Sequence, residues 1–317
     1  MRLVFCGTPE FAVPTLKALI SANHEILLVL TQPDRAAGRG MELQVPPVKR
    51  LALDLGLPVL QPERIKKNEE FRERLQTLQP DVIVVVAYGR IIPEWMLSLP
   101  RLGNINLHGS LLPKYRGAAP VQWAVANGET VTGVTTMKLD PGLDTGEMLL
   151  AHTIAIGQEM GAAEVFDVLA EVGASLMVNT LAGLEAGTIT PTAQDHSQAT
   201  LAPILTREDG LVNFDRQAKT IHDRWRGFYP WPGAHTTFRG KKLILHELRR
   251  AQFEGVTEAA ESTREGELVV DGRRLMVVCG GLTVLTIEEL QVEGKRRMTA
   301  AEFVRGYQVK TGERLGV

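Results

Sequence analysis

The first 110 residues alternate between short apolar runs rich in β-branched residues and longer stretches with helical periodicity. The apolar runs cover residues 3–6, 26–31, 59–60, 82–87 and 105–108, and the helix-like stretches cover 11–21, 48–55, 68–78 and 93–97. Apolar strands that are joined by helices form parallel sheets, because the helical crossovers cover both faces. The pattern therefore predicts an α/β fold with a Rossmann-like, mostly parallel sheet and flanking helices.

The second half of the chain predicts a smaller β unit after the α/β unit. A strand is expected over 147–156 and a helix over about 161–186, whereas 188–206 is rich in Thr, Pro, Gln and Ala without clear periodicity. After a helix over 215–225, short β runs follow at 234–238, 242–248, 267–270, 274–279 and 282–290. Closely spaced short strands are typical of small barrels. We expect an α/β domain over 1–187, a linker over 188–206 and an OB-like β-barrel over 207–317.

The composition excludes several classes of protein. Of the 317 residues, 44% are hydrophobic and 23% are charged, which is ordinary for a soluble globular protein. Cys6 and Cys279 lie far apart in the sequence, so neither a disulfide framework nor a metal site is expected, and the predicted location is the cytoplasm. The N-terminus leads directly into the first predicted strand, and we expect no signal peptide and no membrane-spanning segment.

Three segments at the ends of predicted strands indicate where a ligand binds. They are Gly7, Tyr88-Gly89 and His108-Gly109. Open α/β sheets bind ligands beyond the carboxyl ends of their strands, so these segments predict the position of a site. The chain has neither a G-x-G-x-x-G turn nor a Walker A loop, and a dinucleotide or nucleoside-triphosphate site therefore lacks its main signal.

The candidate catalytic residues at this edge are Asn106, His108 and Asp144. Asn106 and His108 are two residues apart on one predicted strand, so their side chains point to the same side. Amide and imidazole N–H groups can both donate to one oxygen, which suits the oxyanion that forms when an acyl group moves to an amine. Asp144 lies in a glycine-containing loop and can orient and polarise His108. Each residue alone more often has a structural role, so local chemistry leaves both interpretations open.

The residues around this trio carry a more specific signal. Three motifs follow one another: Asn-x-His-x-Ser-Leu-Leu-Pro at 106–113, Lys-Tyr-Arg-Gly at 114–117 and Gly-x-Asp-x-Gly at 142–146. Together they resemble the 10-formyltetrahydrofolate-dependent formyltransferase superfamily. The resemblance covers nearly the whole chain. It implies that Asn106, His108 and Asp144 are catalytic and that 10-formyltetrahydrofolate is the co-substrate. It also implies that the folate is contacted by Ser110, Leu111, Leu112 and Pro113. For the two leucines, plain core packing is the alternative.

The loop after the second predicted strand indicates which acceptor is used. Residues 31–35, 38–40 and 46–49 resemble the long loop of those superfamily members that formylate methionyl-initiator tRNA. At about fifteen residues this loop is longer than most connections in α/β folds. The resemblance implies that Arg39, between two glycines, engages the acceptor stem, and Arg35 and Lys49 are further candidates for phosphate contacts. Without the resemblance, a solvated mobile loop is an equal alternative.

The C-terminal residues offer a second predicted tRNA surface. Asn213 and residues 228–234 resemble the barrel-like C-terminal domain of the same members, and such barrels often bind nucleic acid. Residues 206–317 hold 19 Lys and Arg against 16 Asp and Glu, although the whole chain has a net charge of −2. Lys241 and Lys242 are predicted RNA contacts, and ordinary surface charge is the alternative. Tyr229 and Trp231 are expected to serve core or interdomain packing rather than base stacking.

The combined prediction is an enzyme that moves the formyl group of 10-formyltetrahydrofolate to the α-amine of methionine on initiator tRNA. We expect the protein to act as a monomer. Three alternatives stay open. A formyltransferase for a small amine, such as an amino sugar nucleotide or glycinamide ribonucleotide, would not need the loop at 38–40. A formyltetrahydrofolate hydrolase would release formate, and a non-catalytic RNA- or folate-binding protein would bind without turnover.

Overall fold

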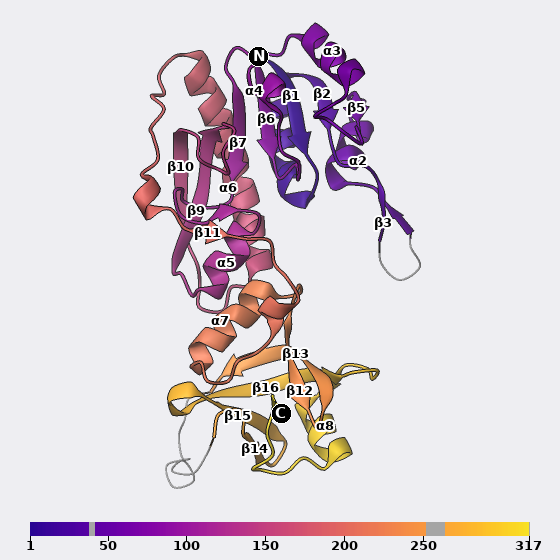
Figure 1. Cartoon of the computed structure of the whole chain (residues 1–317), viewed down its shortest axis with the longest axis vertical. Coiled ribbons are helices and arrows are strands. Elements are labelled where there is room, and N and C mark those ends of the chain that lie inside the picture. The colour runs from indigo at the N-terminus through magenta and orange to yellow at the C-terminus, as the bar shows by residue number, and fades with distance from the viewer. Residues whose placement is uncertain (38–41, 252–263, 317) are drawn as a thin grey trace. The chain divides into compact units, whose positions relative to one another are not determined.

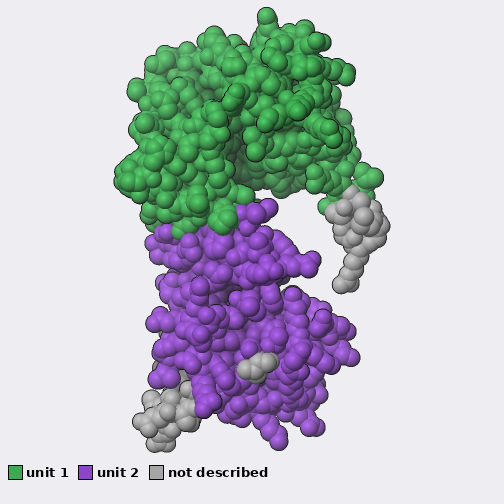
Figure 2. Space-filling view, in the orientation of Figure 1, with its two compact units in different colours: residues 1–120, 131–155, 164–203 green, residues 121–130, 156–163, 204–317 purple. Residues whose placement is uncertain are grey.

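The structure is a computed structural model that describes residues 1–37, 42–251 and 264–316 (Figure 1). Arg39 lies outside these residues. Contacts divide the chain into two compact units (Figure 2). Unit 1 consists of Met1–Pro120, Val131–Ala155 and Glu164–Pro203, and unit 2 of Val121–Thr130, Ile156–Ala163 and Ile204–Val317. Because the units exchange short segments along the sequence, the linear division at 187 and 207 stays a prediction.

Unit 1 is built on a mixed sheet, whose strand order among the described residues is β10-β9-β7-β6-β1-β2-β5. The strands from β7 to β5 are parallel, and β9 and β10 add an antiparallel edge. Their bounds are β1 (Arg2–Gly7), β2 (Glu25–Leu30), β5 (Val59–Leu60), β6 (Val82–Val86), β7 (Asn104–His108), β9 (Val131–Lys138) and β10 (Met148–Ala155). The predicted mostly parallel sheet is confirmed. Strand β9 was not among the strands predicted from the sequence.

Strand β6 shows why these residues form the middle of the sheet. All five of its residues, Val-Ile-Val-Val-Val, are buried. A strand without polar alternation is stable only where both of its faces are covered, and helices provide that cover in unit 1. The helices of unit 1 are α1 (Val13–Ser21), α2 (Pro47–Asp54), α3 (Glu69–Leu78), α4 (Glu94–Leu97) and α6 (Ala162–Glu185), with short 3-10 turns at Glu10–Ala12 and His196–Gln198. Helix α5 (Pro120–Ala126) belongs mostly to unit 2.

Helix α6 packs directly on the sheet. Gly173 permits the close approach, because a Cβ there would lie 2.6 Å from Leu107 Cδ2 of β7. Thr180 Oγ1 lies 2.8 Å from Thr136 Oγ1 of β9. By length and composition α6 could cross a membrane, with a mean hydropathy of 1.4 over its most apolar window, a feature that the sequence analysis did not anticipate. Its contacts with the sheet are those of a core helix.

Two small pairings complete unit 1. Strands β3 (Arg35–Ala37) and β4 (Glu42–Gln44) pair antiparallel outside the main sheet, and in Figure 1 they project from unit 1 beside α2. Strands β8 (Arg116–Gly117) and β11 (Leu201–Ala202) pair in parallel. The second pairing joins the segment after β7 to the segment that was predicted to be a linker, and both belong to unit 1.

Unit 2 contains an antiparallel sheet in the order β12-β13-β16-β15-β14, with β17 paired to β16. The C-terminal tail joins the two edges of this sheet, since Leu315 bridges Phe238 of β12 and Arg314 bridges Glu267 beside β14. The tail thus pairs with both ends of the sheet, as expected for the predicted small barrel. The elements are α7 (Ala218–Phe228), β12 (Ala234–Phe238), β13 (Lys241–Arg250), β14 (Leu268–Asp271), β15 (Arg274–Cys279), β16 (Thr283–Val292), β17 (Met298–Thr299) and α8 (Ala300–Tyr307), with 3-10 turns at Glu208–Gly210 and Gly280–Leu282.

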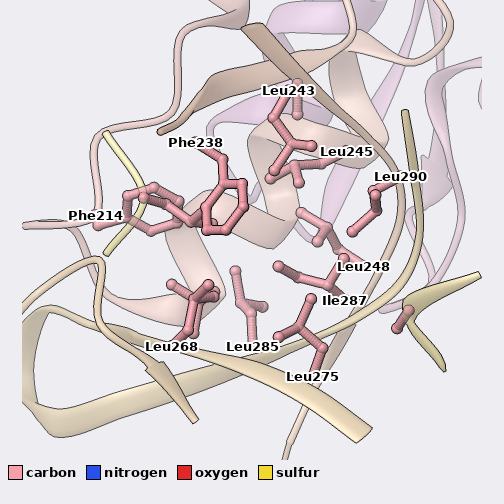
Figure 3. Close-up of a cluster of buried hydrophobic side chains, with 14 of the residues drawn as sticks. Phe214, Phe238, Leu243, Leu245, Leu248, Leu268, Leu275, Leu285, Ile287 and Leu290 are labelled. Carbon is pink, nitrogen blue, oxygen red and sulfur yellow. The ribbon is translucent and has the colours of Figure 1, made fainter. Parts of the chain in front are cut away.

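The core of unit 2 fills this barrel with aliphatic and aromatic side chains (Figure 3). Phe303 of α8 is fully buried and meets Phe238 edge-on, with ring centroids 5.1 Å apart. Leu243, Leu275 and Leu285 have no exposed surface, and burying each contributes about 1.5–3 kcal/mol. The barrel therefore has a hydrophobic core of its own.

Candidate active site

Strand β7 places Asn106 and His108 at the carboxyl end of the sheet. They occupy alternate positions of one strand, so their side chains share a side. Neighbours β6 and β9 pair with the backbone of β7 on both sides. Asn106 is only 9% exposed, and among the described residues its side-chain amide has no hydrogen-bond partner. An unpaired, nearly buried amide costs about 1–3 kcal/mol, which is expected where a bound ligand completes its hydrogen bonding.

The His108 ring is held by neighbours at both nitrogens. Its Nε2 lies 2.9 Å from the backbone oxygen of Tyr115, and its Nδ1 lies 3.6 Å from Asp144 Oδ2. A carbonyl oxygen can only accept, so Nε2 carries a proton and donates it to Tyr115. The separation at Nδ1 is too long for a direct hydrogen bond. Nδ1 is therefore the ring atom available to a substrate, with a carboxylate beside it.

Asp144 comes to this position through a tight loop. Its backbone is left-handed, with a φ of +52°, a conformation that Asp tolerates better than most residues. Its Oδ2 accepts the backbone N–H of Gly117 at 2.8 Å. Gly117 has a φ of +125°, and a Cβ there would lie 2.6 Å from the oxygen of Ala202. Only glycine fits at position 117, and through its N–H it fixes the carboxylate.

Gln194 is a buried residue of this site that the sequence analysis missed. Its Nε2 donates to the backbone oxygens of Asp144 (2.9 Å) and Gly146 (2.7 Å). Its Oε1 accepts from Arg116 Nε at 3.1 Å and Nη2 at 2.7 Å. Arg116 lies between Tyr115, which holds His108, and Gly117, which holds Asp144. One side chain from the predicted linker therefore joins the two segments that position His108 and Asp144.

The predicted folate-contacting run lies directly after β7. Ser110 has no exposed surface, and its Oγ donates to the backbone oxygen of Lys114 at 2.6 Å. Thr135 of β9 donates to the oxygen of Ser110 at 2.7 Å and accepts the N–H of Leu112 at 3.2 Å. Leu112 is buried. Leu111 and Pro113 are half-buried, so these two side chains retain surface for a ligand.

The edge of the sheet next to β7 has a polar network of its own. Gln32, after β2, donates through Nε2 to the oxygens of Tyr88 (3.1 Å) and Gly89 (3.2 Å). Thr8, after β1, also donates to the oxygen of Tyr88 at 3.1 Å. This network brings together the predicted segments at Gly7 and at Tyr88-Gly89. Ala87 and Gly89 are exposed at the end of β6, the strand that pairs with β7.

Two titratable side chains near this edge are held neutral by burial. Burial raises the pKa of the Cys6 thiol, on β1, far above its usual range. Burial likewise raises the pKa of the Tyr88 hydroxyl. Cys6 therefore supplies no thiolate nucleophile, and a covalent acyl-cysteine route gains no support. In the described part of the chain, no group of three or more His, Cys, Asp or Glu residues is placed to hold a metal ion.

The predicted RNA contacts fall into three groups. Lys49 donates to Asp34 Oδ2 at 2.6 Å, so a phosphate would compete with a carboxylate for its ammonium. Arg35 on β3 is exposed, and so are Lys241 and Lys242 at the start of β13. Arg39 falls outside the described residues.

Comparisons with known proteins show the family of the chain. The Formyl transferase family matches residues 1–181, and the Formyl transferase C-terminal domain family matches residues 204–308. The chain belongs to the formyl transferase family. Within it, a methionyl-tRNA formyltransferase of Acidobacterium capsulatum is 60% identical over 316 residues and covers 100% of both chains. Another, from Koribacter versatilis, is 54% identical over 100% of this chain and 99% of its own.

Solved structures of formyl transferases share the fold at low sequence identity. An N-formyltransferase from Helicobacter canadensis, in complex with folinic acid and dTDP-3-aminofucose, superposes with a TM-score of 0.67 at 15% identity, over 90% of this chain and 98% of its own. HypX from Aquifex aeolicus, in complex with tetrahydrofolic acid, gives a TM-score of 0.63 at 16% identity, over 99% of this chain and 48% of its own. These likenesses confirm the fold class of this formyl transferase.

Proposed function

We propose that the chain transfers the formyl group of 10-formyltetrahydrofolate to the α-amine of methionine on initiator tRNA, with Asn106, His108 and Asp144 as its catalytic residues. One observation carries the assignment of the site: an unpartnered amide on Asn106 lies two residues from a histidine whose free nitrogen faces a carboxylate. The full-length similarity to methionyl-tRNA formyltransferases supports the choice of acceptor.

Asn106 and His108 stabilise the charge that develops during transfer. When an amine adds to a formyl carbon, the carbonyl oxygen gains negative charge, and donors already in place lower the barrier. The Asn106 amide supplies one N–H, and His108 Nδ1 supplies the other when it is protonated. Because Nε2 already donates to Tyr115, a proton on Nδ1 makes the ring an imidazolium, and Asp144 at 3.6 Å balances that charge.

Asp144 also offers a place for the proton of the attacking amine. Its Oδ2 is occupied by Gly117, whereas its Oδ1 accepts no hydrogen bond from the residues that the structure describes. The amine must lose a proton as its bond to the formyl carbon forms, and the departing nitrogen of the folate must gain one. The free oxygen of Asp144 can take up the first proton, directly or through water.

The other predicted residues would hold the two substrates. 10-Formyltetrahydrofolate, when bound, supplies the formyl group on a nitrogen that leaves readily. Leu111 and Pro113 fit the wall of its site, because they keep exposed surface beside β7. Residues 207–317, with the exposed Lys241 and Lys242, and the hairpin residue Arg35 would contact the tRNA. We place this activity in the cytoplasm and in a monomer.

The test is direct formylation. The protein is incubated with 10-formyltetrahydrofolate and methionyl-initiator tRNA, and formylmethionine on the tRNA is measured for wild type, Asn106→Ala and the surface control Gln76→Ala on α3. We expect product with wild type and the control, and a loss of at least 100-fold with Asn106→Ala. Free formate without formylated tRNA would instead identify a hydrolase. Formylation of an amino sugar nucleotide in place of tRNA would identify a small-amine enzyme.

A further inference from the structure

A small pocket in unit 2 lies outside the catalytic site. Its cavity of about 60 Å³ is bounded by residues 209–213, by α7 and by the start of β12. That volume is several times the roughly 10–15 Å³ that one water requires, so the pocket has room for a group larger than water. Arg216 and Arg224 line it together with Trp225 and Phe228.

The two arginines give the pocket an unbalanced positive charge. Neither forms an ion pair with any carboxylate in the described part of the chain. Burial lowers the pKa of the Arg224 guanidinium below its usual range, and the positive charge of Arg216 lowers it further. Asp209 is the acidic residue of the lining, and its Oδ2 accepts the N–H and hydroxyl of Thr206 at 2.8 and 3.0 Å. Two guanidinium groups therefore face one carboxylate, which favours an anion.

Arg224 is already held in place for such a contact. Its Nη2 donates to the backbone oxygen of Asp209 at 3.0 Å, and its guanidinium lies 4.8 Å from the centroid of the Phe228 ring. A guanidinium that is stacked and bonded at one nitrogen keeps other N–H groups free in a fixed orientation. Little side-chain entropy is then lost when a phosphate binds.

The loop beside this pocket exposes two aromatic side chains. Tyr229 is 43% exposed and Trp231 is 54% exposed, and the Tyr229 ring lies 6.4 Å from the ring of Trp225, which lines the pocket. Their expected role in core or interdomain packing stays a prediction. The loop starts at Phe228 and ends at Gly233, which both line the pocket, and the N–H of Gly233 donates to the oxygen of Phe228 at 2.9 Å. Exposed aromatic rings and arginine side chains together form the kind of surface on which single-stranded nucleic acid stacks.

A second, larger groove of unit 2 provides the contrast. It is lined by Lys219, Arg249 and Arg250. Each of these cations is paired with a carboxylate: Lys219 with Asp223 at 2.6 Å, Arg249 with Glu247 at 3.0 Å and Arg250 with Glu159 at 3.3 Å. A phosphate gains less from cations that are already neutralised. The smaller pocket is therefore the better anion site.

We propose that Arg216, Arg224, Tyr229 and Trp231, which we call the arginine–aromatic pocket, bind one unstacked nucleotide of the tRNA. The guanidinium groups hold its phosphate, and the aromatic rings stack on its base. This inference rests on the proposed function, because it requires an RNA substrate. An apolar partner would cover the rings equally well but would leave the two arginines without a counter-charge.

The test separates the phosphate contact from the base contact by salt dependence. The dissociation constant for methionyl-initiator tRNA is measured from about 50 to 200 mM salt for wild type, Arg216→Gln, Trp231→Ala and the control Arg305→Gln, an exposed arginine of α8 outside the lining. Arg216→Gln should weaken binding and reduce the slope of log affinity against log salt by about 1. Trp231→Ala should weaken binding by roughly 5- to 100-fold without changing that slope. Arg305→Gln should do neither.

Unchanged affinity and slope in Arg216→Gln and Trp231→Ala would overturn the proposal. So would a loss of thermal stability in Trp231→Ala with tRNA affinity retained, since that result would show that the ring serves packing. Formylation by the wild type, measured in the same samples, keeps the two proposals apart. A wild type that formylates tRNA while both variants bind normally refutes only the pocket, whereas a wild type without formylation refutes the proposed function.

Discussion

The substitution Gln194→Glu tests whether the buried Gln194 amide positions the two segments that hold the proposed catalytic residues His108 and Asp144. Glutamate has the size of glutamine but cannot donate. It retains the acceptor for Arg116, now as a charge-assisted pair, and loses both bonds to the backbone oxygens of Asp144 and Gly146. The change therefore releases the Asp144 loop while it leaves the link to Arg116 in place.

The magnitude follows from the bonds that are lost. Two hydrogen bonds contribute about 1 kcal/mol each, and a carboxylate facing two carbonyl oxygens adds a similar penalty. The stronger pairing with Arg116 offsets about 1 kcal/mol of this, so we expect a net loss of about 1–3 kcal/mol. A domain with 5–15 kcal/mol of stability stays folded after such a loss. A displacement of Asp144 by about 1 Å costs up to about 100-fold in rate.

The assay is steady-state formylation with tRNA as the varied substrate, accompanied by thermal unfolding. We expect kcat to fall about 10- to 100-fold and KM for tRNA to stay within about twofold, because the substrate contacts are untouched. Gln76→Glu, an exposed position on α3, is the matched control and should leave both constants unchanged. A kcat for Gln194→Glu within twofold of wild type, with only the melting temperature lowered, would show that Gln194 stabilises the fold without positioning the catalytic pair.

Three further predictions concern single positions. His108→Ala should lower kcat by about 10²- to 10⁴-fold and leave the dissociation constant for tRNA unchanged; a large loss of affinity would contradict its role. Gly117→Ala should destabilise the protein and abolish most activity, because its Cβ would meet the oxygen of Ala202 at 2.6 Å; full activity would show that the backbone adjusts. Burial lowers the pKa of the His222 imidazole in the folded protein. The unfolded chain therefore binds a proton at His222 more readily, and the free energy of unfolding decreases as the pH falls below about 6.5. His222→Phe should flatten that slope by up to about 1.4 kcal/mol per pH unit in urea unfolding, whereas His152→Gln, at an exposed position, should not.

The parts of the fold that local pattern determines were predictable. The buried run of β6 and the short barrel strands appear where their periodicity places them. Strand β9 was missed because Thr and Gly interrupt its apolar pattern, although most of its residues are buried where it pairs with β7 and β10 and contacts α6. Helix α8 was missed although Thr299 and Glu302 have the spacing of a capping box, which the structure forms. That signal was present in the sequence.

Charge pairing shows a limit of sequence interpretation. Lys49 and the exposed Lys241 look alike in the sequence, yet Asp34 accepts a hydrogen bond from Lys49 at 2.6 Å. Asp34 is fifteen positions from Lys49. No periodicity links these positions, because Asp34 follows β2 whereas Lys49 lies on α2, a separate element. The same reason hides Gln194, which lies 78 positions from the Arg116 side chain that it holds.

The arrangement of the proposed catalytic trio could be predicted from the sequence only in part. The two-residue spacing of Asn106 and His108 places both side chains on the same side of β7. The position of Asp144 next to His108 depends instead on Gly117 and Gln194, and no local sequence pattern connects these residues to Asp144. In the folded chain these contacts saturate Nε2 of His108 and Oδ2 of Asp144. The groups left without a protein hydrogen bond, in the part of the chain that the structure describes, are the Asn106 amide, His108 Nδ1 and Asp144 Oδ1. Because hydrogen bonds hold the His108 ring and the Asp144 carboxylate before a substrate arrives, little reorganisation of these two side chains is required during the transfer itself.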